Sequence, residues 1–278
     1  MTTLALVVLI WIGSLLAGLL GALTGLGGGV VVVPLLVLGF GVDIRYAMGA
    51  SLISVIATSS GAAAAYVKEG FSNIRIGMLL EVATTLGAVA GAYLAVRLHT
   101  ETIAIIFGCV LIATALLSLR RTGEASAEVQ PDPLAERLRL AGSYPSLTGQ
   151  RPYHVRNVPG GFGVMLGAGA LSGLLGIGSG AFKVIAMDLV MKIPFKVSTT
   201  TSNFMIGVTA AASAGIYLRR GFIDPGLAMP VVLGVLVGSV IGTRVLMKAK
   251  TSWLRVIFNV VIFALGVEMI YGGLTGKL

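Results

Sequence analysis

Two apolar segments of this chain, residues 4–40 and 160–191, are too long to cross a lipid bilayer once. A helix over 4–40 would be about 55 Å long at 1.5 Å per residue, whereas the hydrocarbon core of a bilayer is about 30 Å thick. A glycine cluster lies inside each segment, and glycine frees the backbone to leave the helix. We therefore expect each segment to form a helix, a break and a second helix that returns toward the starting side. Six further apolar segments are of ordinary length: 47–66, 76–96, 102–119, 198–218, 226–247 and 253–274.

The composition favours a helical membrane protein over the alternatives. Of 278 residues, 11% are charged and 56% are hydrophobic, while a soluble domain carries about 25% charged residues. So few charges cannot cover a soluble surface, the ample apolar surface excludes disorder, and the alternation typical of a transmembrane β-barrel is absent. The single Cys109 excludes a disulfide framework, and its apolar surroundings predict plain packing. We expect an all-α polytopic membrane protein.

Residues 120–159 differ in composition from the segments around them. Arginine, glutamate and aspartate are followed by proline and serine, which predicts an aqueous linker between two transmembrane parts, residues 1–119 and 160–278. Within it, residues 131–140 predict either a short amphipathic helix on the membrane surface or a solvated loop. The net charge of +9 belongs to loops, where basic residues meet anionic lipid headgroups. No basic stripe with interleaved aromatic residues is present, so we expect no nucleic-acid partner.

The two transmembrane parts are similar to each other at one fixed offset of 151 residues. The matches are Gly25-Leu-Gly27-Gly28-Gly29 with Gly176-Ile-Gly178-Ser179-Gly180, Tyr66 with Tyr217, Ser51 with Ser202, Thr58 with Thr209, and Gly87 and Gly91 with Gly238 and Gly242. Internal duplication is frequent in secondary transporters. We expect two homologous repeats, each a Gly-broken helical hairpin followed by three transmembrane helices.

The distribution of basic residues predicts the orientation of the chain. If both hairpins return, 14 basic residues share the side of the linker and five face the other side. If each of the two long segments crossed only once, the division would be 11 to 8. The stronger bias favours returning hairpins. The linker, residues 120–159, is then cytoplasmic, both termini are outside, and the two repeats are inverted in the membrane.

The glycine breaks are the predicted substrate site. A broken helix exposes backbone N–H groups at the start of its second part, and the helix dipole adds partial positive charge there, a combination that binds anions. The alternative is close packing of helices through small residues. The break residues expected at the site are Gly27, Gly28, Gly29, Gly178, Ser179 and Gly180.

Lys183 follows the second break by three positions, and its counterpart in the first repeat is Val32. An ammonium group inside a membrane segment is costly and usually functional, so we expect Lys183 to bind an anion. It could instead extend to the membrane edge or pair with Asp188. Hydroxyl and amide groups after the breaks can replace water around a small oxyanion, or they form interhelical hydrogen bonds. Those expected at the site are Ser51, Thr200, Ser202 and Asn203.

Three carboxylates in apolar segments, Glu81, Asp188 and Glu268, are candidates for coupling transport to a proton. Each could instead lie near an interface or pair with a basic residue. An enzyme is not expected, because neither His99 nor His154 lies in a span after Ser179 where it could serve as its base. The sequence has no HExxH and no Walker A motif. We therefore expect no catalytic residue, no metal site and no cofactor.

The duplicated halves, the opening GALTGLGGG, the later GALSGLLGIGSG and the polar stretches AMGASL and STTTSNF resemble the TauE/SafE family. This family comprises exporters of sulfite and organosulfur anions of the 4-toluene sulfonate uptake permease type. The resemblance implies a bacterial inner-membrane carrier whose sites lie where two homologous halves meet, at Gly27, Gly28, Gly178, Ser179 and Asn203. These motifs are rich in glycine and indicate the family better than the substrate. The role of Lys183 rests on the argument from its position alone.

The sequence thus predicts a secondary transporter that exports a small sulfur-containing anion, such as sulfite or sulfoacetate, by alternating access between two broken-helix hairpins. An anion channel on the same scaffold and a membrane-embedded enzyme or assembly factor are the alternatives. The expected partners are the anion and a bilayer with anionic headgroups. A homodimer is compatible with the sequence, which does not fix the oligomeric state, the coupling ion or the direction of transport.

Overall fold

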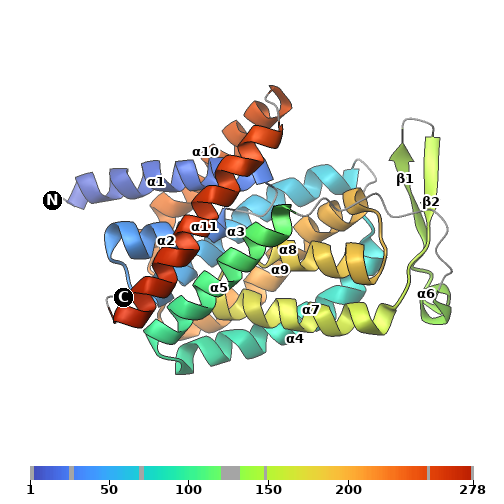
Figure 1. Ribbon diagram of the computed structural model, residues 1–278, viewed down its shortest axis with the longest axis horizontal. Helices are drawn as coiled ribbons and strands as arrows, with labels where there is room; N and C mark the ends of the chain where they lie inside the picture. Colours follow the sequence, from blue (N-terminus) through green and yellow to red (C-terminus); the bar gives the residue numbers. More distant parts are fainter. Residues whose placement is uncertain are drawn as a thin grey trace.

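A computed structural model describes residues 3–24, 28–68, 72–119, 132–146, 149–248 and 251–276 of the chain. Figure 1 shows a bundle of helices with both chain ends at one end and the linker elements at the other. The first half contains α1 (Thr3–Thr24), α2 (Gly29–Pro34), a π-helical segment η1 (Leu35–Gly39), α3 (Ile44–Lys68), α4 (Ile74–Arg97) and α5 (Thr100–Leu119). The second half contains α7 (Val158–Leu175), α8 (Gly180–Ile185), a π-helical segment η2 (Ala186–Val190), α9 (Phe195–Arg219), α10 (Pro225–Lys248) and α11 (Thr251–Thr275).

The helices recur along the chain at the offset found in the sequence. Both bounds of α2, η1, α3 and α4 lie 151 residues before the matching bounds of α8, η2, α9 and α10, as with Ile44 and Phe195 at the starts of α3 and α9. The helices of the last pair, α5 and α11, also start 151 residues apart. The two halves of the chain therefore fold into the same series of elements.

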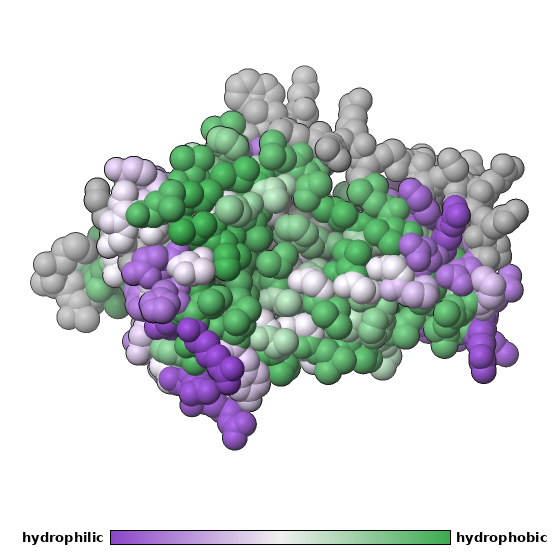
Figure 2. All heavy atoms as spheres, turned by 60° about the horizontal axis from the view of Figure 1, so that its bottom comes forward, coloured by the Kyte–Doolittle hydropathy of each residue, from purple (hydrophilic) through white to green (hydrophobic). Residues whose placement is uncertain are grey.

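Six helices in the described part of the chain are long and apolar enough to cross a membrane: α1, α4, α5, α7, α10 and α11. Figure 2 shows a broad apolar band on one face of the molecule, with hydrophilic residues gathered at its two ends. The helices α3 and α9 have 25 residues each, as many as α11, but they carry the serine and threonine stretches and pack against each other inside the bundle. The expected polytopic helical architecture is present. Cys109, expected in the packed interior, is exposed on α5, because α5 turns Phe107 and Leu111 inward instead.

The two halves interlace, because the first helix of each half packs along the fourth helix of the other. These pairs are α1 with α10 and α7 with α4. A Cβ atom on Gly18 would lie 2.4 Å from the carbonyl oxygen of Val235, and one on Gly169 would lie 2.1 Å from that of Thr84. The two contacts are equivalent under the 151-residue offset. Small residues allow this close approach of helix backbones, as is common in membrane proteins.

The linker departs from the all-α expectation. A single helical turn, α6 (Pro133–Arg137), is capped by the Asp132 side chain, and β1 (Gly142–Ser146) pairs antiparallel with β2 (Gly149–Tyr153). Proline and glycine in both strands disfavour a helix, and the rings of Tyr144 and Tyr153 meet across the hairpin with centroids 6.2 Å apart. The linker is docked, since its buried Leu140, Tyr153 and Val155 belong to one apolar cluster with Ile76 and Leu80 of α4 and Met187 and Met191.

Candidate functional site

The second helix break requires backbone conformations that favour glycine. Helix α7 ends at Leu175, and Gly176, Gly178 and Ser179 follow with φ values of +67°, +72° and +44°. Residues with a side chain rarely adopt this left-handed region of the backbone, whereas glycine adopts it without steric cost. Helix α8 then begins at Gly180. In the first half, α1 ends at Thr24 and α2 begins at Gly29, and Gly27 falls outside the described residues.

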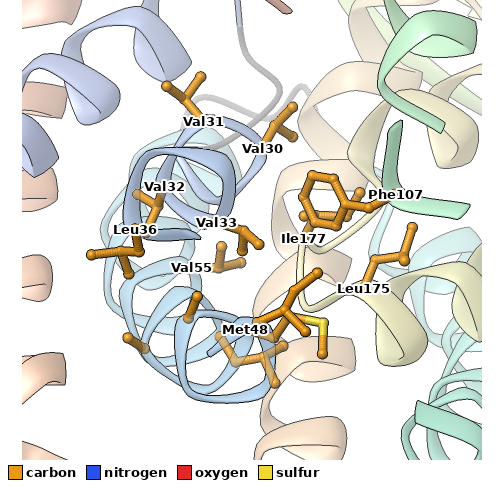
Figure 3. Close-up of a cluster of buried hydrophobic side chains, with 14 of the residues drawn as sticks. Val30, Val31, Val32, Val33, Leu36, Met48, Val55, Phe107, Leu175 and Ile177 are labelled. Carbon is orange, nitrogen blue, oxygen red and sulfur yellow. The ribbon is translucent and has the colours of Figure 1, made fainter. Parts of the chain in front are cut away.

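The two breaks meet in a tightly packed apolar region. Figure 3 shows Val33 and Val55 of the first half facing Ile177, which lies inside the second break. A Cβ atom on Gly29 would lie 2.8 Å from Val55 Cγ2 and 3.6 Å from the Cα atom of Ile177, and one on Gly178 would lie 2.8 Å from Ile206 Cγ2. Gly29 thus lies close to Ile177 of the second break, with valine and isoleucine packed around them, and the expected substrate site at the break residues stays a prediction.

The predicted site hydroxyls bind backbone carbonyls at and around the breaks. Ser51 Oγ donates to the Gly176 carbonyl at 2.8 Å and lies 3.4 Å from that of Gly29. The equivalent Ser202 Oγ donates to the Gly180 carbonyl at 3.3 Å, and Ser179 Oγ donates to the Ala168 carbonyl at 2.7 Å. The alternative interpretation, interhelical hydrogen bonding, describes what these hydroxyls do in this conformation.

Two other predicted residues lie on α9 near these serines. Thr200 Oγ1 donates to the carbonyls of Lys196 and Val197 in its own helix. Asn203 is half-buried, and none of the described contacts joins it to either break. Their expected place at the site therefore stays a prediction.

Lys183 lies at the centre of a charged network that joins three helices. Its side chain is 0% exposed, and Nζ donates a hydrogen bond to Thr209 Oγ1 of α9. Thr209 Oγ1 in turn donates to Oε1 of Glu81 in α4 at 2.7 Å. The other carboxylate oxygen, Oε2, lies 4.0 Å from Lys183 Nζ. We call these three residues the Lys183 network.

The network resolves the alternatives for the charged residues. Lys183 neither extends to the membrane edge nor pairs with Asp188, because its ionic partner is Glu81. Asp188 is buried in η2, and its Oδ2 has no hydrogen-bond partner among the described residues. Glu268 lies on the exposed side of α11. The structure thus brings together Glu81 and Lys183, which belong to separate predictions, and leaves Asp188 and Glu268 apart from them.

Thr209 is the member of the network that is not among the site residues expected from the sequence. Its only signal is the match with Thr58 at the common offset. A threonine can accept one hydrogen bond while donating another, and this property lets Thr209 connect an ammonium to a carboxylate. Its hydroxyl also lies 3.0 Å from the Met205 carbonyl, as expected for threonine inside a helix.

The matching positions in the other half carry no charge. Lys183, Thr209 and Glu81 correspond to Val32, Thr58 and Val232 at the 151-residue offset. Thr58 Oγ1 donates to the carbonyls of Ser54 and Val55 in its own helix. One of two equivalent places in the fold is therefore charged and the other apolar, so the charges are not required to form this arrangement of helices.

One oxygen of Glu81 is left without a hydrogen bond. Thr85 Oγ1 donates to Oε1 at 3.2 Å, so Oε1 has two hydroxyl partners, while buried Oε2 has none among the described residues. Leaving a buried acceptor unsatisfied costs about 1–3 kcal/mol, and more for a charged group. A proton on Oε2, or a donor brought by a ligand, would remove this cost.

A basic pocket lies toward the end of the molecule that carries the chain termini. Its volume is about 250 Å³, and it is lined by Tyr93 of α4 and by Ile216, Arg219 and Arg220 at the end of α9. Ile216 is seven residues beyond Thr209 on α9, which is about 10 Å along a helix. Two guanidinium groups therefore line a pocket on the two helices that also carry Glu81 and Thr209.

At the opposite end, Asn73 fastens the linker to the same two helices. Its Oδ1 caps α4 by accepting from the Ile76 N–H at 3.1 Å, and its own N–H donates to Thr201 Oγ1 of α9 at 3.1 Å. Nδ2 donates to the Leu140 carbonyl at 3.1 Å and to Tyr153 Oη at 2.7 Å. Burial raises the pKa of Tyr153 above its usual value, although the hydrogen bond from Asn73 opposes the shift.

Comparisons with known proteins agree on the class of protein. The model of a family described as sulfite exporter TauE/SafE matches residues 10–269. The probable membrane transporter protein YunE of Bacillus subtilis is 27% identical over 275 residues, which cover 96% of this chain and 98% of that one. The probable membrane transporter protein YdhB of the same organism is 27% identical, covering 82% and 86%. MJ0441 of Methanocaldococcus jannaschii, also named a probable membrane transporter protein, is 23% identical, covering 94% of each chain. No solved structure gives a significant match.

Proposed function

Since the chain belongs to the sulfite exporter TauE/SafE family, we propose that this multi-pass membrane transporter is a secondary carrier that exports a small sulfur-containing anion, such as sulfite or sulfoacetate. The observation that carries the proposal is the complete burial of Lys183 at a position whose counterpart in the other half is the uncharged Val32. Ionisable groups inside transmembrane bundles commonly mark substrate pathways. An ammonium that is held by a neutral hydroxyl keeps N–H donors for the oxygens of an anion.

The contacts between helices suggest which parts move. One unit consists of α1, α3 and α10, the other of α7, α9 and α4, and the two units meet where α3 packs against α9. Each unit contains helices of both sequence halves, so the units that rock against each other are these interlaced groups. Separation of α3 from α9 would part Val55 from the second break and break the Ser51 hydrogen bond to Gly176. The anion would reach Lys183 and the break residues through this opening.

The proposed orientation has the linker in the cytoplasm and both termini outside, with the two repeats inverted in the inner membrane. It is supported by the placement of both chain ends opposite the linker in Figure 1 and by the excess of basic residues on the linker side. Inverted repeats let one arrangement of helices serve both the inward-open and the outward-open states.

The test is anion binding by the purified protein, followed by flux in liposomes. We would screen sulfite, sulfoacetate, thiosulfate, sulfate, taurine, phosphate and chloride for thermal stabilisation, which reaches about 2.7 kcal/mol at a hundredfold excess over Kd. Lys183→Met should weaken binding by about 10- to 100-fold, the value of one hydrogen bond to a charged group. Lys196→Met, which removes an exposed lysine from the start of α9, is the control and should bind normally.

The flux assay separates the carrier from the channel. A carrier exchanges labelled anion across the liposome membrane when unlabelled anion is present on the other side, whereas a channel conducts current without such exchange. No stabilisation by any of these anions, or unchanged binding in Lys183→Met, would contradict the proposed site.

A further inference from the structure

We propose, on the basis of the proposed function, that each anion binds together with one proton. The anion replaces Glu81 as the ionic partner of Lys183, and Glu81 takes up the proton on Oε2. The starting point is that Lys183 and Glu81 balance each other's charge inside the bundle. Their charged atoms lie 4.0 Å apart, with the hydroxyl of Thr209 as the only hydrogen-bonded link between them in the described part of the chain.

The charge balance makes simultaneous binding favourable. An anion bound to Lys183 would leave the Glu81 carboxylate as an uncompensated charge inside the protein, and such a charge is strongly destabilising. Protonation of Glu81 removes that charge without moving any helix. When the anion and the proton leave, Lys183 and Glu81 again balance each other, so a monovalent anion crosses with no net charge in either half of the cycle.

The hydrogen bonds provide the places for both ligands. Lys183 Nζ has three N–H donors, of which Thr209 takes one in the described contacts, leaving donors for anion oxygens. Oε1 of Glu81 is held by the hydroxyls of Thr85 and Thr209, and Oε2 is buried without a hydrogen-bond partner among the described residues. The proton therefore has a defined destination, and the protonated Oε2 gains an O–H donor that can bind an anion oxygen.

In the described part of the chain, α7 and α9, which pack against α4, bring no titratable group to Glu81 that competes with Lys183. Helix α7 has no ionisable side chain between Val158 and Leu175. Helix α9 carries Lys196, which is exposed, and Tyr217, whose hydroxyl donates to the carbonyls of Gly173 and Leu174; its remaining ionisable residue, Arg219, lines the basic pocket. On α4 itself, Arg75 and Arg97 lie in the first and last turns, and Tyr93 lines the basic pocket. Lys183 on α8 is the charged group that faces Glu81.

This coupling defines how the gradients drive transport. Each turnover that moves an anion outward also moves a proton outward. For a monovalent anion, net export occurs when the outward anion gradient exceeds the inward proton gradient, and it stops where the two are equal. The membrane potential alone does no work on a monovalent anion and its proton, because the pair carries no net charge.

The experiment measures proton uptake on anion binding by the full-length protein in detergent. Binding of sulfite and of sulfoacetate is followed by calorimetry in two buffers that differ in ionisation enthalpy, for the wild type, Glu81→Gln and, as a matched buried carboxylate, Asp188→Asn. The readout is the difference between wild type and Glu81→Gln, which cancels the titration of the ligand itself. Beyond the protons taken up by the ligand itself, we expect one proton per anion in the wild type and in Asp188→Asn, and none in Glu81→Gln.

The outcomes separate this inference from the proposed function. Anion binding with equal proton uptake in wild type and Glu81→Gln would overturn the coupling and leave the carrier intact. Absence of binding of either anion to the wild type would overturn both. If Glu81→Gln does not fold, the wild type still decides: its affinity for sulfoacetate should fall about tenfold per pH unit once Glu81 is ionised in the empty protein, and a flat profile would overturn the coupling.

Discussion

Lys183 and Glu81 are ionic partners that do not touch directly: Nζ and Oε2 lie 4.0 Å apart, and the hydroxyl of Thr209 is bound to both side chains. The two residues are 102 positions apart in the sequence, and they meet because α4 and α8 both pack against α9. Each of the three helices contributes one residue, so a change in the packing of any one of them alters the electrostatics of the other two.

Thr209→Val should destabilise the protein more than Thr58→Val, the matched substitution in the other half. Thr209 bonds two ionised groups, and hydrogen bonds to charged groups contribute about 1.5–3 kcal/mol each, whereas Thr58 bonds carbonyls of its own helix. Thermal unfolding in detergent at one pH measures the difference. Equal losses would show that the hydroxyl does not support the charged pair.

The charges of Lys183 and Glu81 should be strongly coupled in a double-mutant cycle. Removing one partner of a buried ion pair costs about 3–5 kcal/mol, because the other charge remains buried and unpaired, while replacing both is often close to neutral. We therefore expect Lys183→Met and Glu81→Gln each to lower stability, and the double variant to recover most of the loss. Additive losses would mean that the two residues act independently.

Gly178→Ala should lower stability by about 1–3 kcal/mol, the cost of holding a residue with a side chain in the left-handed region. The added Cβ would also lie 2.8 Å from Ile206 Cγ2. Gly167→Ala is the control, because a Cβ atom on this glycine of α7 would meet no atom within 4 Å and alanine favours the helix. The measurement is the melting temperature of each variant, and a similar loss in both would argue against a strained break.

The docking of the linker should weaken at high pH. Burial raises the pKa of Tyr153 from its ordinary value of 10.0, so the folded state favours the neutral phenol. Ionisation of this phenol in the unfolded chain begins near pH 10, whereas in the folded protein it requires a higher pH. Ultraviolet titration of the wild type against Tyr153→Phe isolates this tyrosine, and we expect the linker to undock as the pH rises through its raised pKa. Ionisation of Tyr153 at or below the ordinary pKa would contradict its burial between the linker and α4.

Cysteine labelling should place the linker and the C-terminus on opposite sides of the membrane. On a Cys109→Ser background, a cysteine replacing exposed Ala141 is expected to react only with reagent added from the cytoplasmic side. A cysteine replacing exposed Gly276 should react only from outside. Labelling of position 141 from outside would overturn the proposed orientation and the inverted arrangement built on it.

The features predicted correctly from the sequence depend on local composition. The pairing of charged residues, which depends on how helices distant in the sequence pack together, was not predicted. The glycine clusters predicted the breaks, and the offset of 151 residues predicted the recurrence of the elements, because both depend on residues close together in the chain. The pairing of Lys183 with Glu81, instead of with Asp188 only five positions away, depends on how α4, α8 and α9 pack. The β-hairpin of the linker was not predicted, because its strands are short and interrupted by proline and glycine.

The interlaced packing of α1 with α10 has a consequence for biosynthesis. During translation α1 emerges about 200 residues before the helix that covers Gly18, and proteins are made at about 5–20 residues per second. Gly18 of α1 therefore stays without its native packing partner, α10, for at least about ten seconds. Neither half of the chain, if made alone, contains the helix that packs along its own first helix, since α1 packs on α10 and α7 packs on α4. The protein becomes a single packed unit only when the last hundred residues have entered the membrane.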